Sequence, residues 1–210
     1  MRNITIETQI KALNTGLTLT KAIGNSYVCI HVNSGLSALG YHKPMETDIS
    51  EYIPLFTFEN AIMVCRKHKL KLPVGRANSG GWWDKGVKKP RLAFVNWMIR
   101  QLETQAKEIN KQIELLEAVK TKIINRTELF ICNGIQDILF DKGIIDEVNY
   151  GSFDPSVHIS ICTRENAKLV CIEAGVIEPF EYLNSWWYYD NPTSRVVFID
   201  WMVKQLKEQL

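Results

Sequence analysis

The stretch from Arg91 to Leu102 reads RLAFVNWMIRQL, and it returns near the end of the chain as RVVFIDWMVKQL, from Arg195 to Leu206. Six of the twelve positions are identical, and the others exchange similar residues. The first copy places four aliphatic side chains on one helical face, which predicts an amphipathic helix: Leu92, Val95, Ile99 and Leu102. A helix that occurs twice in one chain indicates an internal duplication.

Three further pairs of segments match in the same order along the chain: TFENAIMVC (57–65) with TRENAKLVC (163–171), DIS (48–50) with DPS (154–156), and Trp82-Trp83 with Trp186-Trp187. We therefore predict a tandem duplication. Its parts are an N-terminal segment (1–23), a basic first module (24–105), a helical linker (106–125) and an acidic second module (126–210).

Each module is predicted to be α+β, in the order helix, strand, helix, strand, helix. The short segments YIPLFT (52–57) and VHISICT (157–163) favour a strand because we interpret their pattern as alternating. Thr57 and Thr163 stand where a helix N-cap belongs. The Trp doublets are expected on the second strand, with one ring pointing inward and the other outward.

The closing helix of the first module has two apolar faces. We expect Phe94 and Trp97 to pack on the sheet of the same module, and the Leu92 face to pack on the counterpart helix of the other module. The apolar spacing then continues through Ala106, Ile109, Ile113, Leu116 and Ile123, without Gly or Pro. This predicts one long central helix of about 35 residues with a coiled-coil-like seam.

The seam of the long helix needs a partner. One alternative is intramolecular, since Ile6, Ile10, Leu13 and Leu17 have a matching spacing in the N-terminal segment. The other alternative is a homodimer through residues 92–123.

Composition indicates a globular protein without a membrane span. Hydrophobic residues make up 46% and charged residues 23% of the chain. No run approaches the ~20 apolar residues of a transmembrane helix, and the N-terminus lacks the features of a secretory signal. The five cysteines form no CxxC pair. We expect a cytoplasmic protein with reduced thiols.

The two modules differ most in charge. Residues 66–91 contain nine basic residues and one acid, a net charge of +8, whereas residues 172–195 contain four acids and one base, a net charge of −3. The basic segment surrounds the glycine- and tryptophan-containing stretch GGWWDKG. Lys and Arg would neutralise phosphates, and an exposed Trp would stack on a base. The predicted binding residues are Arg66, Lys67, Lys69, Lys71, Arg76, Trp82, Trp83, Lys85, Lys88, Lys89 and Arg91. The alternative is that the charges only solvate the surface and the Trp doublets pack in the core.

The sequence contains no catalytic signature. Its four histidines have no histidine counterparts in the other module, and GxSxG, Walker A and HExxH patterns are absent. Glu59 and Glu165 are retained, but a carboxylate in the first turn of a helix is explained by the helix dipole. We expect no catalytic residue, no metal site and no cofactor.

The predicted function is that of a non-enzymatic binding protein. Its basic first module would engage nucleic acid or an acidic surface of a nucleic-acid-associated protein, and the chain would act as an inhibitor or adaptor by occlusion or bridging. Two alternatives stay open. One is an enzyme with one active and one degenerate repeat, and the other is a self-associating structural protein whose basic and acidic modules meet.

Overall fold

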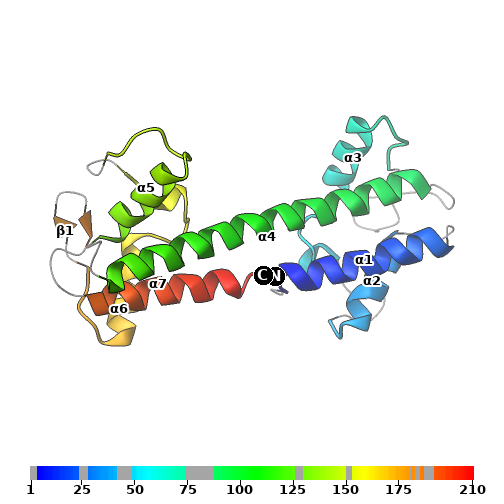
Figure 1. Ribbon diagram of the computed structural model, residues 1–210. Helices are drawn as coiled ribbons and strands as arrows, with labels where there is room; N and C mark the ends of the chain where they lie inside the picture. The colour runs from blue at the N-terminus through cyan, green and yellow to red at the C-terminus, as the bar shows by residue number, and fades with distance from the viewer. Residues whose placement is uncertain are drawn as a thin grey trace. The chain divides into compact units, whose positions relative to one another are not determined.

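The computed structural model describes residues 4–23, 28–41, 49–73, 88–125, 130–149, 153–179, 181–182, 185–186 and 192–210 (Figure 1). Seven α-helices lie in these ranges: α1 (Ile6–Ile23), α2 (Val28–Ala38), α3 (Phe58–Lys67), α4 (Lys88–Ile124), α5 (Ile131–Asp141), α6 (Arg164–Ala174) and α7 (Pro192–Lys207). The long central helix predicted from the sequence is α4, which has 37 residues. None of the helices in the described ranges has the length and apolar character needed to cross a bilayer.

The predicted α+β class is wrong, because the described part of the chain is helical apart from one very short hairpin. Its strands are β1 (Glu181–Tyr182) and β2 (Ser185–Trp186), which pair antiparallel. Segments 52–57 and 157–163, predicted as strands, are instead turns that begin at the 3-10 helices η1 (Ile49–Glu51) and η2 (Pro155–Val157).

Local hydrogen bonds explain why the predicted strands are turns. The amides of Tyr52 and Ile53 both donate to the Ile49 carbonyl, at 3.0 and 2.8 Å, and the amide of Phe56 donates to the Ile53 carbonyl at 2.8 Å. All four of these residues are buried. Their spacing of three and four residues is that of a helical turn, whereas a strand would bury every second residue. The pattern interpreted as alternating therefore predicted the wrong element.

The chain divides into two compact units that are larger than the predicted modules. Unit 1 comprises Met1–Lys107 with Gln209–Leu210, and unit 2 comprises Glu108–Glu208. The boundary falls within α4, so the first part of this helix belongs to unit 1 and the second part to unit 2. The segments 1–23 and 106–125, predicted to lie outside the modules, supply the first helix of each unit.

The duplication covers these first helices too. Identical residues recur at corresponding positions of α1 and the second part of α4, and of α2 and α5: Ile6/Ile109, Gln9/Gln112, Ile10/Ile113, Leu13/Leu116, Cys29/Cys132, Leu36/Leu139 and Gly40/Gly143. Leu13 and Leu116 are both fully buried, and Gly40 and Gly143 both have positive φ. In the described residues each unit therefore contains four helical segments that occur in the same order.

The closing helices pack on helices and turns rather than on a sheet. Phe94 of α4 is fully buried, 5.6 Å from the ring of Phe56 and stacked on Trp97 at 6.2 Å. Phe198 of α7 is buried in the same way and stacks on Trp201 at 5.9 Å. The expected packing of Phe94 on a sheet is thus corrected, since segment 52–57 supplies the facing ring as a turn.

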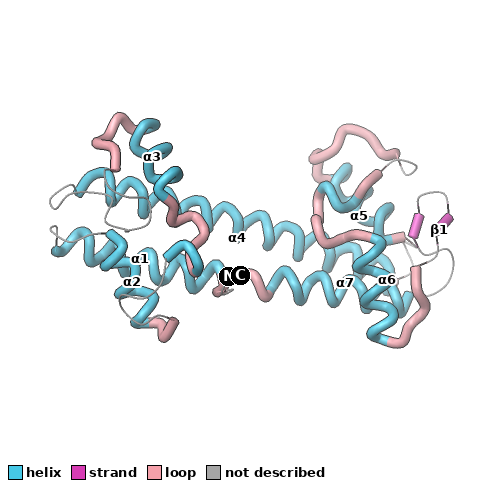
Figure 2. The backbone as a smooth tube through the Cα atoms, turned by 180° about the vertical axis from the view of Figure 1, so that it is seen from behind, coloured by secondary structure: helices cyan, strands magenta, loops and turns pink. Residues whose placement is uncertain are grey.

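Each closing helix lies beside the first helix of its own unit. In unit 1 the first part of α4 runs along α1, and in unit 2 α7 runs along the second part of α4 (Figures 1 and 2). Along the predicted seam Ile109, Leu116 and Ile123 are buried, whereas Ala106 and Ile113 are half-buried. In unit 2 the helix beside this seam is α7 (Figure 1) rather than the predicted N-terminal segment, which belongs to unit 1. A homodimer through residues 92–123 remains a prediction.

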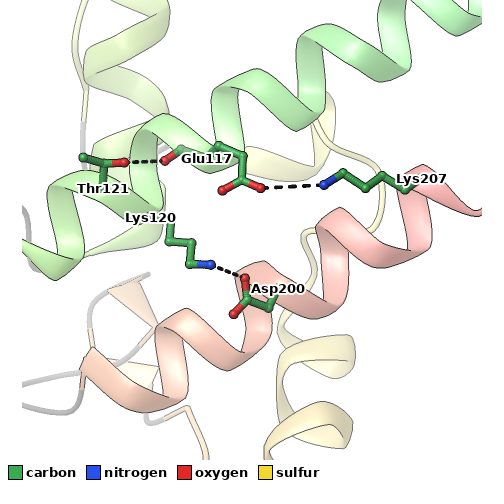
Figure 3. Close-up of polar contacts among 5 residues, drawn as sticks. All are labelled: Glu117, Lys120, Thr121, Asp200 and Lys207. Atoms are coloured by element: carbon green, nitrogen blue, oxygen red, sulfur yellow. Dashed lines mark hydrogen bonds and ion pairs between the residues drawn. The ribbon is translucent and has the colours of Figure 1, made fainter.

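Ion pairs connect the two paired helices of unit 2. Lys120 of α4 contacts Asp200 of α7 at 2.5 Å, and Lys207 lies 4.0 Å from Glu117, whose carbonyl accepts from Thr121 (Figure 3). The hydrogen bond to Asp200 raises the pKa of Lys120. Partly exposed pairs of this kind contribute about 0–1 kcal/mol each. In unit 1 the positions of Lys120 and Asp200 hold Leu17 and Asn96, so these ion pairs are specific to unit 2.

The last two residues complete the start of α1. The amides of Ile6 and Glu7 donate to the carbonyls of Gln209 at 2.9 Å and Leu210 at 2.6 Å. The first amides of a helix have no partner within the helix, so these bonds satisfy two of them. At the corresponding point of the duplication α4 continues without a break. At the start of α1, hydrogen bonds to residues 209–210 thus stand where α4 has a continuous backbone.

Candidate anion-binding surface

Four of the predicted binding residues cluster where α3 ends. Arg66 and Lys67 form its last turn, Lys69 and Lys71 follow it, and all four side chains are exposed. We call these four residues the α3 basic end. Cations at the C-terminus of a helix are favoured by its dipole. Among the residues that the structure describes, Arg66, Lys67 and Lys69 form no ion pair, so three of the four are available to an anion.

The start of α3 explains why the two units retain the same short motif. The Thr57 hydroxyl accepts from the amide of Asn60 at 3.2 Å, and the Asn60 side chain donates to the Leu55 carbonyl at 3.0 Å. The same bonds recur in unit 2 with the same distances, between Thr163, Asn166 and Ile161. The predicted N-caps are confirmed, and the retained asparagine anchors the helix to the preceding turn.

The backbone of Lys69 is in a conformation that suits glycine. Its φ is +51°, and the corresponding residue of unit 2 is Gly175, with φ +64°. Both amides donate to the carbonyl three residues earlier, at 3.2 Å. Gly175 is the C-cap of α6, whereas Lys69 follows His68, the C-cap of α3. A side chain in the left-handed region costs roughly 1 kcal/mol, which glycine avoids. Unit 1 therefore carries a lysine where the geometry favours glycine.

We expect Lys69→Gly to stabilise unit 1 by about 1 kcal/mol, because glycine removes the strain of the left-handed backbone. The measurement is urea unfolding followed by circular dichroism. Lys67→Gly is the matched control: it lies inside α3 and should destabilise the unit by a similar amount. An equal change in the free energy of unfolding in the two variants would contradict the idea that Lys69 has a strained backbone.

The corresponding positions in unit 2 have no basic residues. The residues that correspond to Arg66, Lys67, Lys69 and Lys71 are Ile172, Glu173, Gly175 and Ile177, and all four are exposed. α3 and α6 share their N-caps, and the amides of Lys69 and Leu70 make the same backbone bonds as those of Gly175 and Val176, so folding does not require the four cations.

The other predicted binding residues lie in different places. Lys88 and Lys89 open α4 and are exposed, and Lys88 donates to the Lys21 carbonyl at 2.6 Å. Arg91 is only 1% exposed, and burial lowers its pKa; its counterpart Arg195 is 2% exposed. Arg91 therefore belongs to the interior of unit 1 rather than to its surface. Four predicted residues lie outside the described ranges: Arg76, Trp82, Trp83 and Lys85.

A buried polar pair in unit 1 was not predicted. The Thr20 hydroxyl donates to the Gly16 carbonyl at 2.8 Å and lies 2.7 Å from Nδ1 of His31. A hydroxyl donates only once, so Nδ1–H of His31 must be the donor in the second bond. Burial lowers the pKa of His31, and the positive charge of Arg91 lowers it further. One indication of this pair was present in the sequence. Unit 1 has polar residues at these two positions, whereas the corresponding residues of unit 2 are Ile123 and Gly134.

The depressed pKa of His31 predicts a loss of stability in acid. Because folding lowers this pKa below its ordinary value of 6.5, the folded state binds fewer protons than the unfolded state as pH falls through that value. The free energy of unfolding should therefore decrease from about pH 7 to about pH 5. His31→Gln keeps a donor for Thr20 but does not titrate, so its unfolding should depend less on pH. Parallel pH profiles for the two proteins would rule out His31 as the cause.

The geometry offers little for catalysis in the described ranges. They contain no group of three His, Cys, Asp or Glu side chains arranged to hold a metal ion. Burial raises the pKa of the Cys132 thiol to about 12 and that of Cys162 well above its usual range, so both stay protonated at neutral pH. A cleft of about 440 Å³ in unit 2 is lined by charged side chains and by Leu115, Leu139 and Ile144.

No protein-family model matches the sequence, and the comparisons with curated proteins and with solved structures return no similar protein either.

Proposed function

We propose that the protein binds nucleic acid through the α3 basic end and acts by occlusion or bridging rather than by catalysis. The observation that carries this proposal is the contrast between two equivalent helix ends. One bears four exposed cations and the other bears none, although their backbones make the same bonds. Unit 1 also retains Lys69 at positive φ, which costs stability. A charge kept at the expense of local stability is typical of a functional residue.

The chemistry of the surface suits phosphates. Arg66, Lys67 and Lys69 lie within four residues of one another and can each displace a counterion from the nucleic-acid backbone. This mode of binding is independent of base sequence and weakens steeply with salt. Lys88 and Lys89 would add to the positive field of the same unit.

The test is fluorescence anisotropy of labelled single- and double-stranded oligonucleotides, titrated with protein at several salt concentrations. We expect binding whose logarithmic salt slope decreases by roughly 3 when all four residues of the α3 basic end are changed to Gln. The matched control changes four exposed lysines elsewhere: Lys107, Lys111, Lys142 and Lys204. It removes the same total charge and should bind nearly as the unchanged protein does.

Two results would contradict the proposal. The first is the absence of binding at low salt, which would leave an acidic protein surface as the partner class. The second is an equal loss in both quadruple variants, which would mean that net charge alone drives binding.

Lys69→Gly gives a more specific test, because it should raise the stability of the fold and lower the affinity for oligonucleotide. The variant introduces the residue that unit 2 has, so it should fold more stably and yet bind oligonucleotide about two- to fivefold more weakly. Unchanged affinity would show that the charge of Lys69 is not used in binding.

A cytoplasmic location is part of the proposal. Four cysteines are buried as thiols: Cys65, Cys132, Cys162 and Cys171. Thiols persist in reducing compartments, where disulfides are rare.

A further inference from the structure

Unit 2 exposes three large aliphatic side chains where α6 ends. Leu169 is 59% exposed, Ile172 is 53% exposed, and Ile177, just beyond the helix, is 66% exposed. We call these three residues the α6 apolar face. Glu173 and Glu178 flank it and are exposed, and Glu178 also pairs with Lys168 of the same unit at 3.9 Å. Clustered exposed aliphatic residues beside charged ones are typical of a protein-docking site.

The same chain carries a surface of complementary chemistry at the corresponding place in unit 1. There the α3 basic end lies between two exposed apolar residues, Met63 and Leu72. Lys67 stands where unit 2 has Glu173, and Leu72 stands where it has Glu178. One surface is thus aliphatic with two acids, and the other is basic with two apolar side chains.

We propose that the α6 apolar face of one chain binds the α3 basic end of a second copy. Met63 and Leu72 would supply apolar contacts to Leu169, Ile172 and Ile177, with the opposite charges at the rim. An apolar centre with a polar rim is the usual anatomy of a protein interface, and complementary charges set its partner and orientation. The two surfaces are different, so the contact either occurs twice in a closed dimer or propagates in open chains.

The docking regulates the nucleic-acid surface, because both partners would use the same cations. A second copy would cover the α3 basic end, and an oligonucleotide would displace it. This competition rests on the proposed function, whereas the contact between copies does not.

Sedimentation velocity over a range of protein concentrations, at about 50 mM and about 500 mM salt, tests the contact. We expect association that weakens with salt. Glu173→Lys/Glu178→Lys gives a chain with two basic surfaces. Arg66→Glu/Lys67→Glu/Lys69→Glu leaves three acids and Lys71 at the α3 basic end, which gives a chain with two acidic surfaces. Each variant alone should associate at least about tenfold more weakly, because like charges would face each other. An equimolar mixture should associate again, since each basic surface then meets an acidic one.

A control variant reverses two exposed acids of α4, Glu103→Lys/Glu114→Lys, and should associate as the unchanged chain does. Circular dichroism of each variant shows that it is folded. A monomer at every concentration, or a mixture that stays monomeric, overturns the docking contact. If copies associate but oligonucleotide neither binds nor disperses them, the contact stands and the proposed function fails. If oligonucleotide binds a chain that never associates, only the docking contact fails.

Discussion

Replacing Gly35 by alanine is expected to destabilise unit 1 by about 3 kcal/mol or more. Gly35 lies in α2 where this helix crosses α1, and a Cβ atom there would lie 2.3 Å from the carbonyl oxygen of Ala12 and 2.9 Å from its Cα. Neither atom belongs to a flexible side chain, so the helices would have to move apart. The loss should appear in urea unfolding followed by circular dichroism, as a lower midpoint.

Gly40→Ala is the matched control for this prediction. Gly40 follows α2 and has a φ of +80°, but a Cβ atom there would meet no atom within 4 Å. Its replacement therefore carries conformational strain without a clash, at a cost of about 1 kcal/mol. If both variants lost the same stability, contact between α1 and α2 at Gly35 would not be close enough to matter.

Truncating either of the paired phenylalanines, by Phe94→Ala or Phe198→Ala, is expected to cost about 3–5 kcal/mol. Both rings are fully buried, and Phe94 also loses its contact with Phe56. Because the two residues belong to different compact units, each change should open its own unit first. Hydrogen exchange should show lost protection in α1 and α2 for Phe94→Ala, and in α5 and α6 for Phe198→Ala.

Half-buried neighbours supply the comparison. Trp97→Ala and Trp201→Ala remove larger rings that are only partly buried, so each should cost less than truncation of the adjacent phenylalanine. Loss of protection throughout the chain in either phenylalanine variant would mean that the two units unfold as one.

The amino-acid sequence determined those features that depend on local pattern. The matching segments indicated the duplication, the apolar spacing after Pro90 predicted the long helix, and Thr57 and Thr163 marked the starts of α3 and α6. The four residues of the α3 basic end could be predicted to be exposed, because runs of charge beyond a helix end are rarely buried.

Other features were decided by tertiary contacts. Segment 52–57 has the composition of a strand, but packing of Phe56 against Phe94 selects the turn. Glycine is a poor helix former, yet Gly35 is required in α2 by the close crossing of α1 and α2. Arg91 has the charge of a binding residue and lies inside unit 1. For the turn and for Gly35 the local preference is worth about 1 kcal/mol or less, whereas burial of one large apolar side chain contributes about 2–3 kcal/mol, so packing prevails.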